Sequence, residues 1–330
     1  MILSDEAIIS FLQISSVPYE ENIHLSAKTW IKRGGIGRFF IMPKDMEQMK
    51  TVVKYFLQNK TPFHVVGATS NIYIQNTCDL HIVISTLNVD QEEEFDDYVI
   101  CGCGVNVTGL SRKMVKNGYV GYEGLVGLPG TIGGAIVNNS SAFGYSVCQM
   151  SKEIYCIDEN GNDLVLSSDD LKLTAHSSAI KTKENRCIVV GAKLLKKKGS
   201  VEDLKSKSEK YQKQRASLQH EIAMTLGSCF YKLSKSTLLT ILLTVRFLTR
   251  KTIKIFCSKK VQEKRLERTL FYTLSGYHDL ARYVDIIQPN CFIWRDEKAD
   301  DVFFRQYLPF MKKYYKAEDL EIEIISDDKI

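Results

Sequence analysis

The segments with the clearest chemical potential are short and rich in glycine. Residues 124–144 hold a dense cluster of the chain's 20 glycines. Two shorter loops precede it: Gly67–Asn71 follows the apolar run Phe63–Val66, and Gly102–Gly104 follows Tyr98–Cys101. Glycine is useful where backbone must approach a ligand closely, and neighbouring backbone N–H groups at a strand end bind anions. Together the three segments predict a pocket for a large, flat, phosphorylated cofactor.

Other site chemistries have weaker support. A dinucleotide fingerprint of the G-x-G-x-x-G kind is missing, since Val107 stands where the third glycine after Gly102 and Gly104 should be. We interpret the cysteines as mostly buried thiols, with a disulfide between Cys101 and Cys103 as the less favoured alternative. The histidines lack ligand spacing, so the sequence predicts no metal site. The nine cysteines lie at positions 78, 101, 103, 148, 156, 187, 229, 257 and 291.

The elements that position these loops indicate an α+β fold. Residues 46–57 show helical spacing of apolar side chains before the strand at 63–66, and 107–114 suit one face of a second helix. Strands are expected at 81–86, 98–101 and 186–195. The segments 153–158 and 163–166 flank Glu159-Asn160-Gly161-Asn162, which predicts a hairpin.

Composition and charge bound the class of protein. A chain of 330 residues with 44% hydrophobic residues is expected to form a large core and two or three domains. Its first residues do not resemble a secretory signal, so the protein is expected to stay in the cytoplasm. Basic residues crowd 193–215, where a helix over 200–217 is expected to expose them to solvent; steering of anionic substrates is the functional alternative, and nucleic acid is not expected as a partner. The apolar run 238–245 is too short to span a membrane and predicts a core element. The basic stretch 246–254 leaves an amphipathic membrane-surface contact as an alternative.

Four segments in order resemble a known family. Arg33-Gly34-Gly35-Ile36-Gly37, the Gly67–Asn71 loop, Gly102-Cys103-Gly104 and 127–135 (GLPGTIGGA), continued by 139–144, look like the successive FAD-contacting segments of the UDP-N-acetylenolpyruvoylglucosamine reductase family. The resemblance implies a fold of the vanillyl-alcohol-oxidase type, in which two α+β subdomains hold FAD and a smaller α+β domain covers the substrate. The expected boundaries are 1–85, 86–217 and 218–330.

The same resemblance carries over the cofactor contacts. FAD is expected to be noncovalent, since no histidine lies in the Gly67 loop, and NADPH is the implied hydride donor. The expected cofactor-binding residues are Arg33, Gly34, Gly67, Ala68, Thr69, Ser70, Asn71, Gly102, Gly104, Gly127, Pro129, Gly130, Thr131, Gly133, Gly134 and Asn139.

Two C-terminal segments resemble the family's proton-transfer residues. Residues 226–232 are similar to its Gly-Ser-Phe-Phe-Lys segment, which implies that Ser228 is the general acid. Residues 320–324 are similar to its Leu-Glu-x-Glu-Val strand, which implies that Glu323 assists. Alternation along a strand would place Glu321 and Glu323 on one face. Residues 290–293 and a helix over 298–316, bent at Pro309, resemble the family's closing strand and helix.

The chain also departs from the family's pattern. His176 stands in 175–178 (AHSS) where the family has the arginine of Tyr-Arg-x-Ser, and arginine offers a permanent bidentate fork that histidine lacks. Between Ser234 and Pro289 the family's Lys-Gly and Ser-x-Lys-His segments are missing. The implied function is NADPH-driven reduction of the enolpyruvyl group of a UDP-sugar in cell-wall or surface-polysaccharide synthesis. The alternatives are a similar flavoenzyme that oxidises a sugar or an alcohol, and a degenerate FAD-binding subunit.

Overall fold

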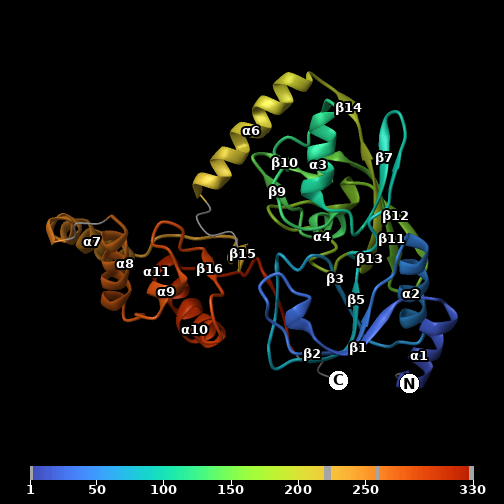
Figure 1. Cartoon of the computed structure of the whole chain (residues 1–330), viewed down its shortest axis with the longest axis horizontal. Helices are drawn as coiled ribbons and strands as arrows, with labels where there is room; N and C mark the ends of the chain where they lie inside the picture. Colours follow the sequence, from blue (N-terminus) through green and yellow to red (C-terminus); the bar gives the residue numbers. More distant parts are fainter. Residues whose placement is uncertain (1–2, 219–223, 257–259, 327–330) are drawn as a thin grey trace. The chain divides into compact units, whose positions relative to one another are not determined.

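The structure is a computed structural model, shown in Figure 1, that describes residues 3–218, 224–256 and 260–326. The chain divides into two compact units. Unit 1 consists of Met1–Ser70, Ile74–His220 and Ile325–Ile330, and unit 2 consists of Asn71–Tyr73 and Glu221–Ile324. The expected boundaries at residues 85 and 217 remain predictions.

The first sheet of unit 1 has four strands in the order β1 (Tyr19–His24), β2 (Ile36–Ile41), β5 (Asp79–Ser85) and β3 (His64–Val66). β1 and β2 are antiparallel, whereas β2, β5 and β3 are parallel to one another. A parallel pair needs a crossover connection, and α2 (Met46–Gln58) supplies the one between β2 and β3. The Asp45 side chain caps α2 by accepting from the Gln48 N–H, and the apolar face of the helix is buried. The helix–strand unit expected at 46–66 is therefore confirmed.

The second sheet has five antiparallel strands in the order β12 (Asp163–Leu166), β11 (Ser151–Asp158), β13 (Cys187–Leu195), β7 (Tyr98–Gly102) and β6 (Glu92–Glu94). The expected hairpin joins β11 to β12. Its turn is closed by Asp158 Oδ1, which accepts from the N–H groups of Asn160 and Asn162 at 2.9 and 2.8 Å. Side chains from α1 (Asp5–Ile14), α2 and both sheets form one continuous buried core, so the two sheets belong to one folded body.

Shorter elements of unit 1 surround the glycine-rich segments. α3 (Val107–Lys116) and α6 (Val201–Leu218) confirm the two helices expected there. Most residues of α6 are exposed, as its charge pattern predicted. The remaining short elements are η1 (Leu25–Ala27), β8 (Tyr119–Val120), α4 (Ile132–Val137), β9 (Ser141–Ala142), β10 (Tyr145–Ser146), α5 (Val147–Met150), η2 (Asp169–Leu171) and β14 (Lys197–Lys198).

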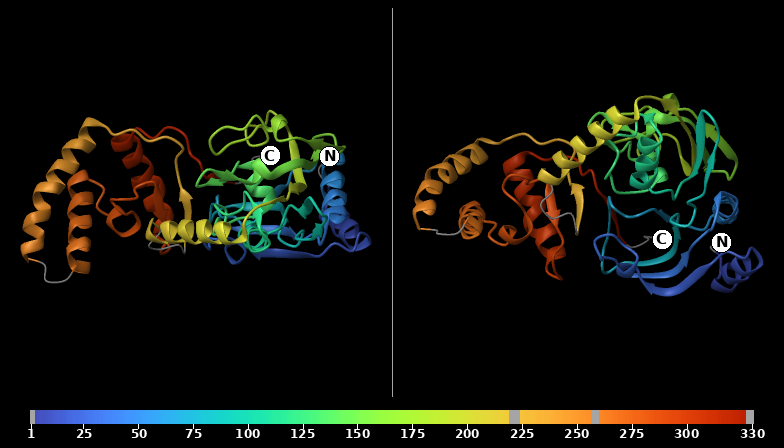
Figure 2. Two further views of the ribbon diagram at one scale, coloured as in Figure 1. Left: turned by 90° about the horizontal axis from the view of Figure 1, so that it is seen from above. Right: turned by 45° about the horizontal axis from the view of Figure 1, so that its top comes forward.

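Unit 2 is mainly helical and has an aromatic core. Two strand pairs accompany the helices. One joins β15 (Thr225–Ser228) to β16 (Cys291–Ile293), and the other joins β4 (Ile72–Ile74) to β17 (Glu323–Ile325), of which only Ile74 and Ile325 belong to unit 1. Tyr73 stacks on Trp294 with ring centroids 5.8 Å apart, and Phe292 and Phe303 contact the same indole. The helical elements are α7 (Thr237–Phe256), α8 (Lys260–Ser275), α9 (Leu280–Tyr283), α10 (Ala299–Val302), the π-helical turn η3 (Phe303–Tyr307) and α11 (Leu308–Tyr315). In both views of Figure 2, α7 and α8 run side by side.

Three expectations for unit 2 need correction or refinement. The apolar run 238–245 forms part of α7, but only Leu239 and Leu242 are buried, while Leu238, Ile241 and Val245 are exposed. The strand expected at 320–324 begins only at Glu323, because Glu321 and Ile322 form a bend. The helix expected at 298–316 changes to π-helical hydrogen bonding directly before Pro309, which lies in the first turn of α11, where its missing N–H is tolerated.

The remaining expectations concern thiols, metals and membranes. Eight cysteines are free, and six of these, including Cys101 and Cys103, are buried; Cys257 lies outside the described residues. Within the described residues, no group of three or more His, Cys, Asp or Glu side chains is placed to hold a metal ion. Across that same part of the chain, the helices are too short or too polar for any of them to cross a bilayer.

Candidate active site

The structure joins the four glycine-rich segments into one cluster within unit 1. The turn that leads into the first segment is linked to the second by a backbone-to-side-chain bond, in which the Trp30 N–H donates to Thr69 Oγ1 at 2.7 Å. Within the first segment, the Gly34 N–H donates to Asn76 Oδ1 at 2.9 Å. Thr69 is buried with φ at +54°, a conformation uncommon for a β-branched residue, so this loop is held in shape by its surroundings.

The Gly67–Asn71 loop also contacts the fourth segment. Ser70 Oγ donates to the carbonyl oxygen of Pro129 at 3.4 Å. A Cβ added to Gly67 would lie 2.5 Å from Thr131 Oγ1, so a side chain at that position would force the two loops apart. Thr131 Oγ1 also accepts from the Gly134 N–H at 3.4 Å, capping α4. The Gly67–Asn71 loop and the fourth segment are therefore closely packed against each other.

The third segment and the residue after it are hydrogen-bonded to the fourth segment through the backbone. The Gly133 N–H donates to the Cys103 carbonyl, and the Ile132 N–H donates to the Val105 carbonyl, both at 2.9 Å. Added Cβ atoms at Gly102 and Gly104 would lie 2.3 Å from the Val89 carbonyl oxygen and 1.9 Å from that of Thr86. Close backbone packing alone accounts for both glycines. Their expected contact with FAD stays a prediction.

Two side chains around this cluster present buried polar atoms without a protein partner. Arg215 of α6 lies beside Gly127, and its Nε and Nη2 atoms are buried with no hydrogen-bond partner in the described part of the chain. Its guanidinium lies 5.5 Å from the centre of the Phe143 ring, and desolvation lowers its pKa. Asn139 has φ at +42° and donates through Nδ2 to the Thr174 carbonyl at 2.8 Å, while its Oδ1 is buried and unpaired over the same residues.

These groups fit a flavin nucleotide. A diphosphate needs hydrogen-bond donors and positive charge, and the buried guanidinium of Arg215 provides both. A flavin ring has both an N–H and carbonyl oxygens, and Asn139 Oδ1 is an acceptor of the kind that such an N–H requires. Leaving buried donors and acceptors unpaired costs about 1 to 3 kcal/mol each, which a bound ligand would relieve. The orphaned atoms thus support a ligand at this cluster more directly than the glycines do.

Arg215 is a candidate binding residue that the sequence does not single out, because it lies among the basic residues of 193–215 that are expected to be solvent exposed. The available signal was the pairing of Tyr211 with Arg215 at i and i+4, which places both on one helix face. In the structure Tyr211 stacks on Phe143 with ring centroids 4.6 Å apart, and Phe143 in turn faces Arg215.

His176 lies in unit 1 and is tied to the end of the glycine-rich region. It occupies a tight turn with φ at +57°, closed by pairing between Thr174 and Ser177. Asn139 donates to the carbonyl of Thr174, so the turn is attached to the segment that follows α4. His176 is half-buried. Its role as a substitute for the arginine of the family stays a prediction.

Ser228 and Glu323 lie in unit 2, on neighbouring segments. Ser228 ends β15, is exposed, and pairs in register with Cys291. The next residue, Cys229, accepts from the Glu321 N–H at 2.8 Å through its carbonyl, which brings the two segments together. Glu323 is half-buried, and its N–H donates to the Asn71 carbonyl at 2.9 Å. The bend at Glu321 means that the alternation expected for a single strand does not apply to the two glutamates.

Comparison with known proteins identifies the family. Residues 38–167 match a family described as a FAD binding domain. Two relatives named UDP-N-acetylenolpyruvoylglucosamine reductase, from Staphylococcus aureus strains COL and Newman, are each 32% identical over 208 residues, covering 63% of this chain and 67% of each relative. The chain belongs to the UDP-N-acetylenolpyruvoylglucosamine reductase family. It is a FAD-dependent oxidoreductase, as the glycine-rich segments indicated.

A solved structure agrees on the fold. The UDP-N-acetylenolpyruvylglucosamine reductase from Thermus caldophilus is similar with a TM-score of 0.63, and the match covers 93% of this chain and 99% of that one. At 18% identity the match shows the fold alone. The α+β fold of the FAD-binding, vanillyl-alcohol-oxidase type is therefore confirmed.

Proposed function

We propose that this protein reduces the enolpyruvyl double bond of a UDP-sugar with NADPH, in the manner of a UDP-N-acetylmuramate dehydrogenase, for cell-wall or surface-polysaccharide synthesis. The observation that carries the proposal is the single cluster formed by the four glycine-rich segments, with the unpaired donors of Arg215 beside it. Family membership supports the choice of reaction. Both NADPH and a UDP-sugar are cytoplasmic metabolites, so we also assign the protein to the cytoplasm.

Different residues bind different parts of the cofactor. Backbone N–H groups of the Gly67–Asn71 loop and the Arg215 guanidinium bind the flavin diphosphate, because they supply donors and positive charge together. The Gly127–Gly134 loop lines the same site, although most of its N–H groups already donate within the protein. Asn139 Oδ1 accepts from a ligand N–H. When bound, FAD supplies hydride transfer from NADPH to the substrate.

Proton transfer falls to residues of unit 2. Addition of a hydride to one carbon of the double bond leaves the other to take a proton, and Ser228 Oγ donates it. A serine hydroxyl is a weak acid, so the step requires that the alkoxide be stabilised and reprotonated; the exposure of Ser228 gives water access for this. Glu323 assists as a proton-holding group, and His176 hydrogen-bonds the substrate carboxylate in place of the family's arginine.

The substitution at His176 keeps a second function open. A single imidazole donor holds a carboxylate less firmly than the bidentate fork of arginine. This departure, with the missing Lys-Gly and Ser-x-Lys-His segments, favours a flavoenzyme of the same fold that acts on a different substrate, such as a sugar or an alcohol.

The test is anaerobic mixing of the purified yellow protein with NADPH, followed by UDP-N-acetylglucosamine enolpyruvate. We expect NADPH to bleach the flavin absorbance and the enolpyruvyl substrate to restore it. Bleaching by a sugar or alcohol donor and not by NADPH would establish the alternative function. Bound FAD that responds to neither reductant would mark a degenerate binding subunit.

A further inference from the structure

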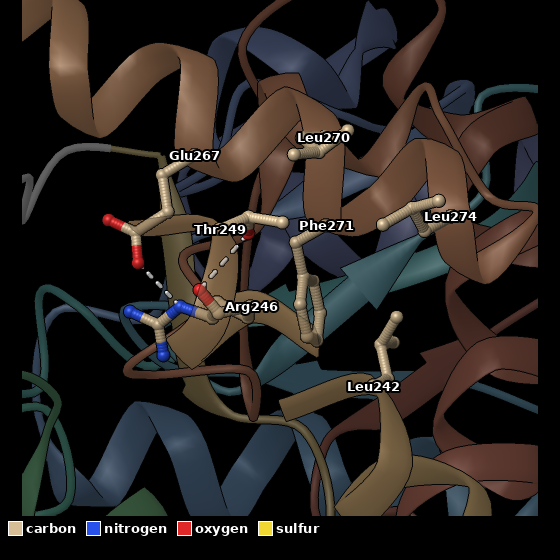
Figure 3. A pocket seen from close by; sticks show the side chains of 7 residues that line it. All are labelled: Leu242, Arg246, Thr249, Glu267, Leu270, Phe271 and Leu274. Atoms are coloured by element: carbon tan, nitrogen blue, oxygen red, sulfur yellow. Dashed lines mark hydrogen bonds and ion pairs between the residues drawn. The ribbon is translucent and has the colours of Figure 1, made fainter. Parts of the chain in front are cut away.

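The helices α7 and α8 form a hairpin whose inner face is well packed. Leu242 of α7 and Phe271 of α8 are buried, and together with Leu270 and Leu274 they line a shallow crevice between the helices (Figure 3). Beside this crevice Arg246 Nε donates to Glu267 Oε1 at 2.7 Å, and only 7% of the Glu267 side chain is exposed. The hairpin is therefore held by both an apolar seam and a half-buried ion pair.

The outer face of α7 carries a second apolar stripe that the hairpin does not cover. Leu238, Ile241, Val245, Leu248 and Ile255 follow one another at intervals of three, four, three and seven residues, so they share one side of the helix. Their exposed fractions are 50, 57, 37, 65 and 80%. Nine of the 17 exposed large apolar side chains among the described residues lie on α7 and α8. Scattered exposed apolar residues are ordinary, but a contiguous stripe marks an interaction surface.

The hairpin also concentrates positive charge. Residues 237–275 contain nine lysines and arginines and only two acids, whereas the whole chain has a net charge of +5, so the remainder of the chain is slightly acidic. Both acids face inward. Glu267 binds Arg246, and the Glu263 carboxylate, whose side chain is 15% exposed, lies 4.0 Å from Arg250. The outer surface of the hairpin is left with exposed cations such as Lys254, Lys264 and Arg265.

The exposed apolar stripe and the positive charge of the hairpin together indicate which kind of partner it binds. A second copy of the chain would bring two strongly basic hairpins into contact, and like charges oppose such a dimer. A nucleic acid would neutralise the charge but would leave the apolar stripe in water. An anionic bilayer surface satisfies both, because its headgroups attract lysine and arginine while its acyl boundary takes up apolar side chains.

We propose that the α7–α8 hairpin binds the surface of an anionic phospholipid bilayer, with the stripe Leu238, Ile241, Val245, Leu248 and Ile255 inserted at the acyl boundary. The four basic residues within α7 exclude a spanning helix. The helix instead lies in the plane of the interface. This surface is separate from the glycine-rich cluster, so the proposal does not depend on the identity of the enzyme's substrate.

The experiment is co-sedimentation of the full chain, loaded with FAD, with lipid vesicles. Vesicles of phosphatidylglycerol and phosphatidylcholine are compared with vesicles of phosphatidylcholine alone, at low and at high salt. We expect binding to the anionic vesicles that weakens as salt rises, and little binding to the neutral ones. Failure to sediment with anionic vesicles at low salt would overturn the proposal.

Variants separate the apolar from the electrostatic contribution. Replacing Ile241, Leu248 and Ile255 with Gln should weaken anionic vesicle binding at least tenfold. The double change Lys254→Glu and Arg265→Glu should weaken it by about fivefold or more per residue. The matched control replaces Ile14, Val165 and Ile287 with Gln, since these side chains are 59 to 85% exposed and lie outside the hairpin.

Three outcomes contradict the assignment. One is a stripe variant that binds vesicles as well as the control does. Another is a wild-type chain that dimerises in sedimentation equilibrium through the same stripe and ignores vesicles, which would make a second copy the occupant. The third is salt-sensitive capture by RNA that the apolar changes leave unaltered. Far-UV circular dichroism of each variant confirms that the helices persist, so a loss of binding reports the surface itself.

Discussion

Replacing Arg215 with Met tests whether the unpaired guanidinium binds the cofactor or merely supports α6. Methionine keeps an unbranched apolar side chain against Phe143 and Gly127 but removes every donor and the charge. If Arg215 binds an anionic group of FAD, its loss removes charge-assisted hydrogen bonds worth about 1.5 to 3 kcal/mol. The dissociation constant of FAD should then rise about tenfold to a hundredfold.

The apoprotein should respond in the opposite sense. Without ligand, Nε and Nη2 of Arg215 are buried without partners, so their removal relieves a desolvation cost and forfeits a cation–π contact of about 0.5 to 1 kcal/mol. We therefore expect the free energy of unfolding of the apoprotein to be unchanged or slightly raised. A purely structural arginine would instead lower it.

Calorimetry with and without FAD separates these effects. At a FAD concentration a hundred times the wild-type dissociation constant, bound cofactor stabilises the wild-type protein by about 2.7 kcal/mol, and a variant that binds thirtyfold more weakly retains about 0.9 kcal/mol of this. The matched control is Lys213→Met, because Lys213 lies on the same helix, is exposed, and carries the same charge. FAD binding by Arg215→Met within twofold of the control, or an apoprotein destabilised by more than about 2 kcal/mol, would refute the reasoning.

Three further substitutions test other parts of the structure. Ser228→Ala should lower turnover about 10²- to 10⁴-fold while flavin reduction by NADPH in stopped flow stays normal, and an unchanged turnover would remove serine from the proton path. Gly104→Ala places a Cβ 1.9 Å from the Thr86 carbonyl oxygen, so the free energy of unfolding in denaturant should fall by about 3 kcal/mol with or without FAD. The hydrogen bond from His81 lowers the pKa of Asp5, burial opposes this, and Arg38 lowers the pKa further. Because the folded-state pKa is depressed, this carboxylate stabilises the fold at neutral pH and loses that effect on acidification. Asp5→Asn should therefore cost about 0.5 to 1 kcal/mol at pH 7. The difference should begin to shrink as the pH falls below about 4 and should be lost as the pH passes through the depressed pKa of Asp5; a difference that does not shrink on acidification would contradict the account.

The sequence predicted those helices and turns whose residues are close together in the chain. The helix α2 follows from the helical spacing of its apolar side chains, and the β11–β12 hairpin follows from the turn sequence between Asp158 and Asp163. The glycine-rich segments were recognisable in the sequence because closely packed backbone requires glycine, and glycine can be counted directly. Their mutual contacts were not, since the bond between Trp30 and Thr69 joins residues that no local pattern relates.

The misses share one physical cause, which is that tertiary packing decides among locally equivalent choices. The run 238–245 is apolar on more than one face, so nothing in it indicates that Leu239 is buried while Ile241 is exposed. In the sequence Arg215 cannot be told from the basic residues around it, and only the fold places Phe143 and Gly127 against its side chain. The bend at Glu321 arises where the carbonyl of Cys229 captures the Glu321 N–H, a contact across 92 residues of sequence.

The pairing of β4 with β17 has a consequence for the newly made chain. The Asn71 carbonyl, at the end of the Gly67 loop, accepts from the N–H of Glu323, and the Gln75 N–H donates to the carbonyl of Ile325. On the ribosome, β4 emerges some 250 residues before its partner strand. At about 5 to 20 residues per second that delay amounts to roughly 13 to 50 s. During this time the loop that follows β3 lacks its final backbone anchors, so we expect stable flavin loading only after β17 has been synthesised and has paired with β4.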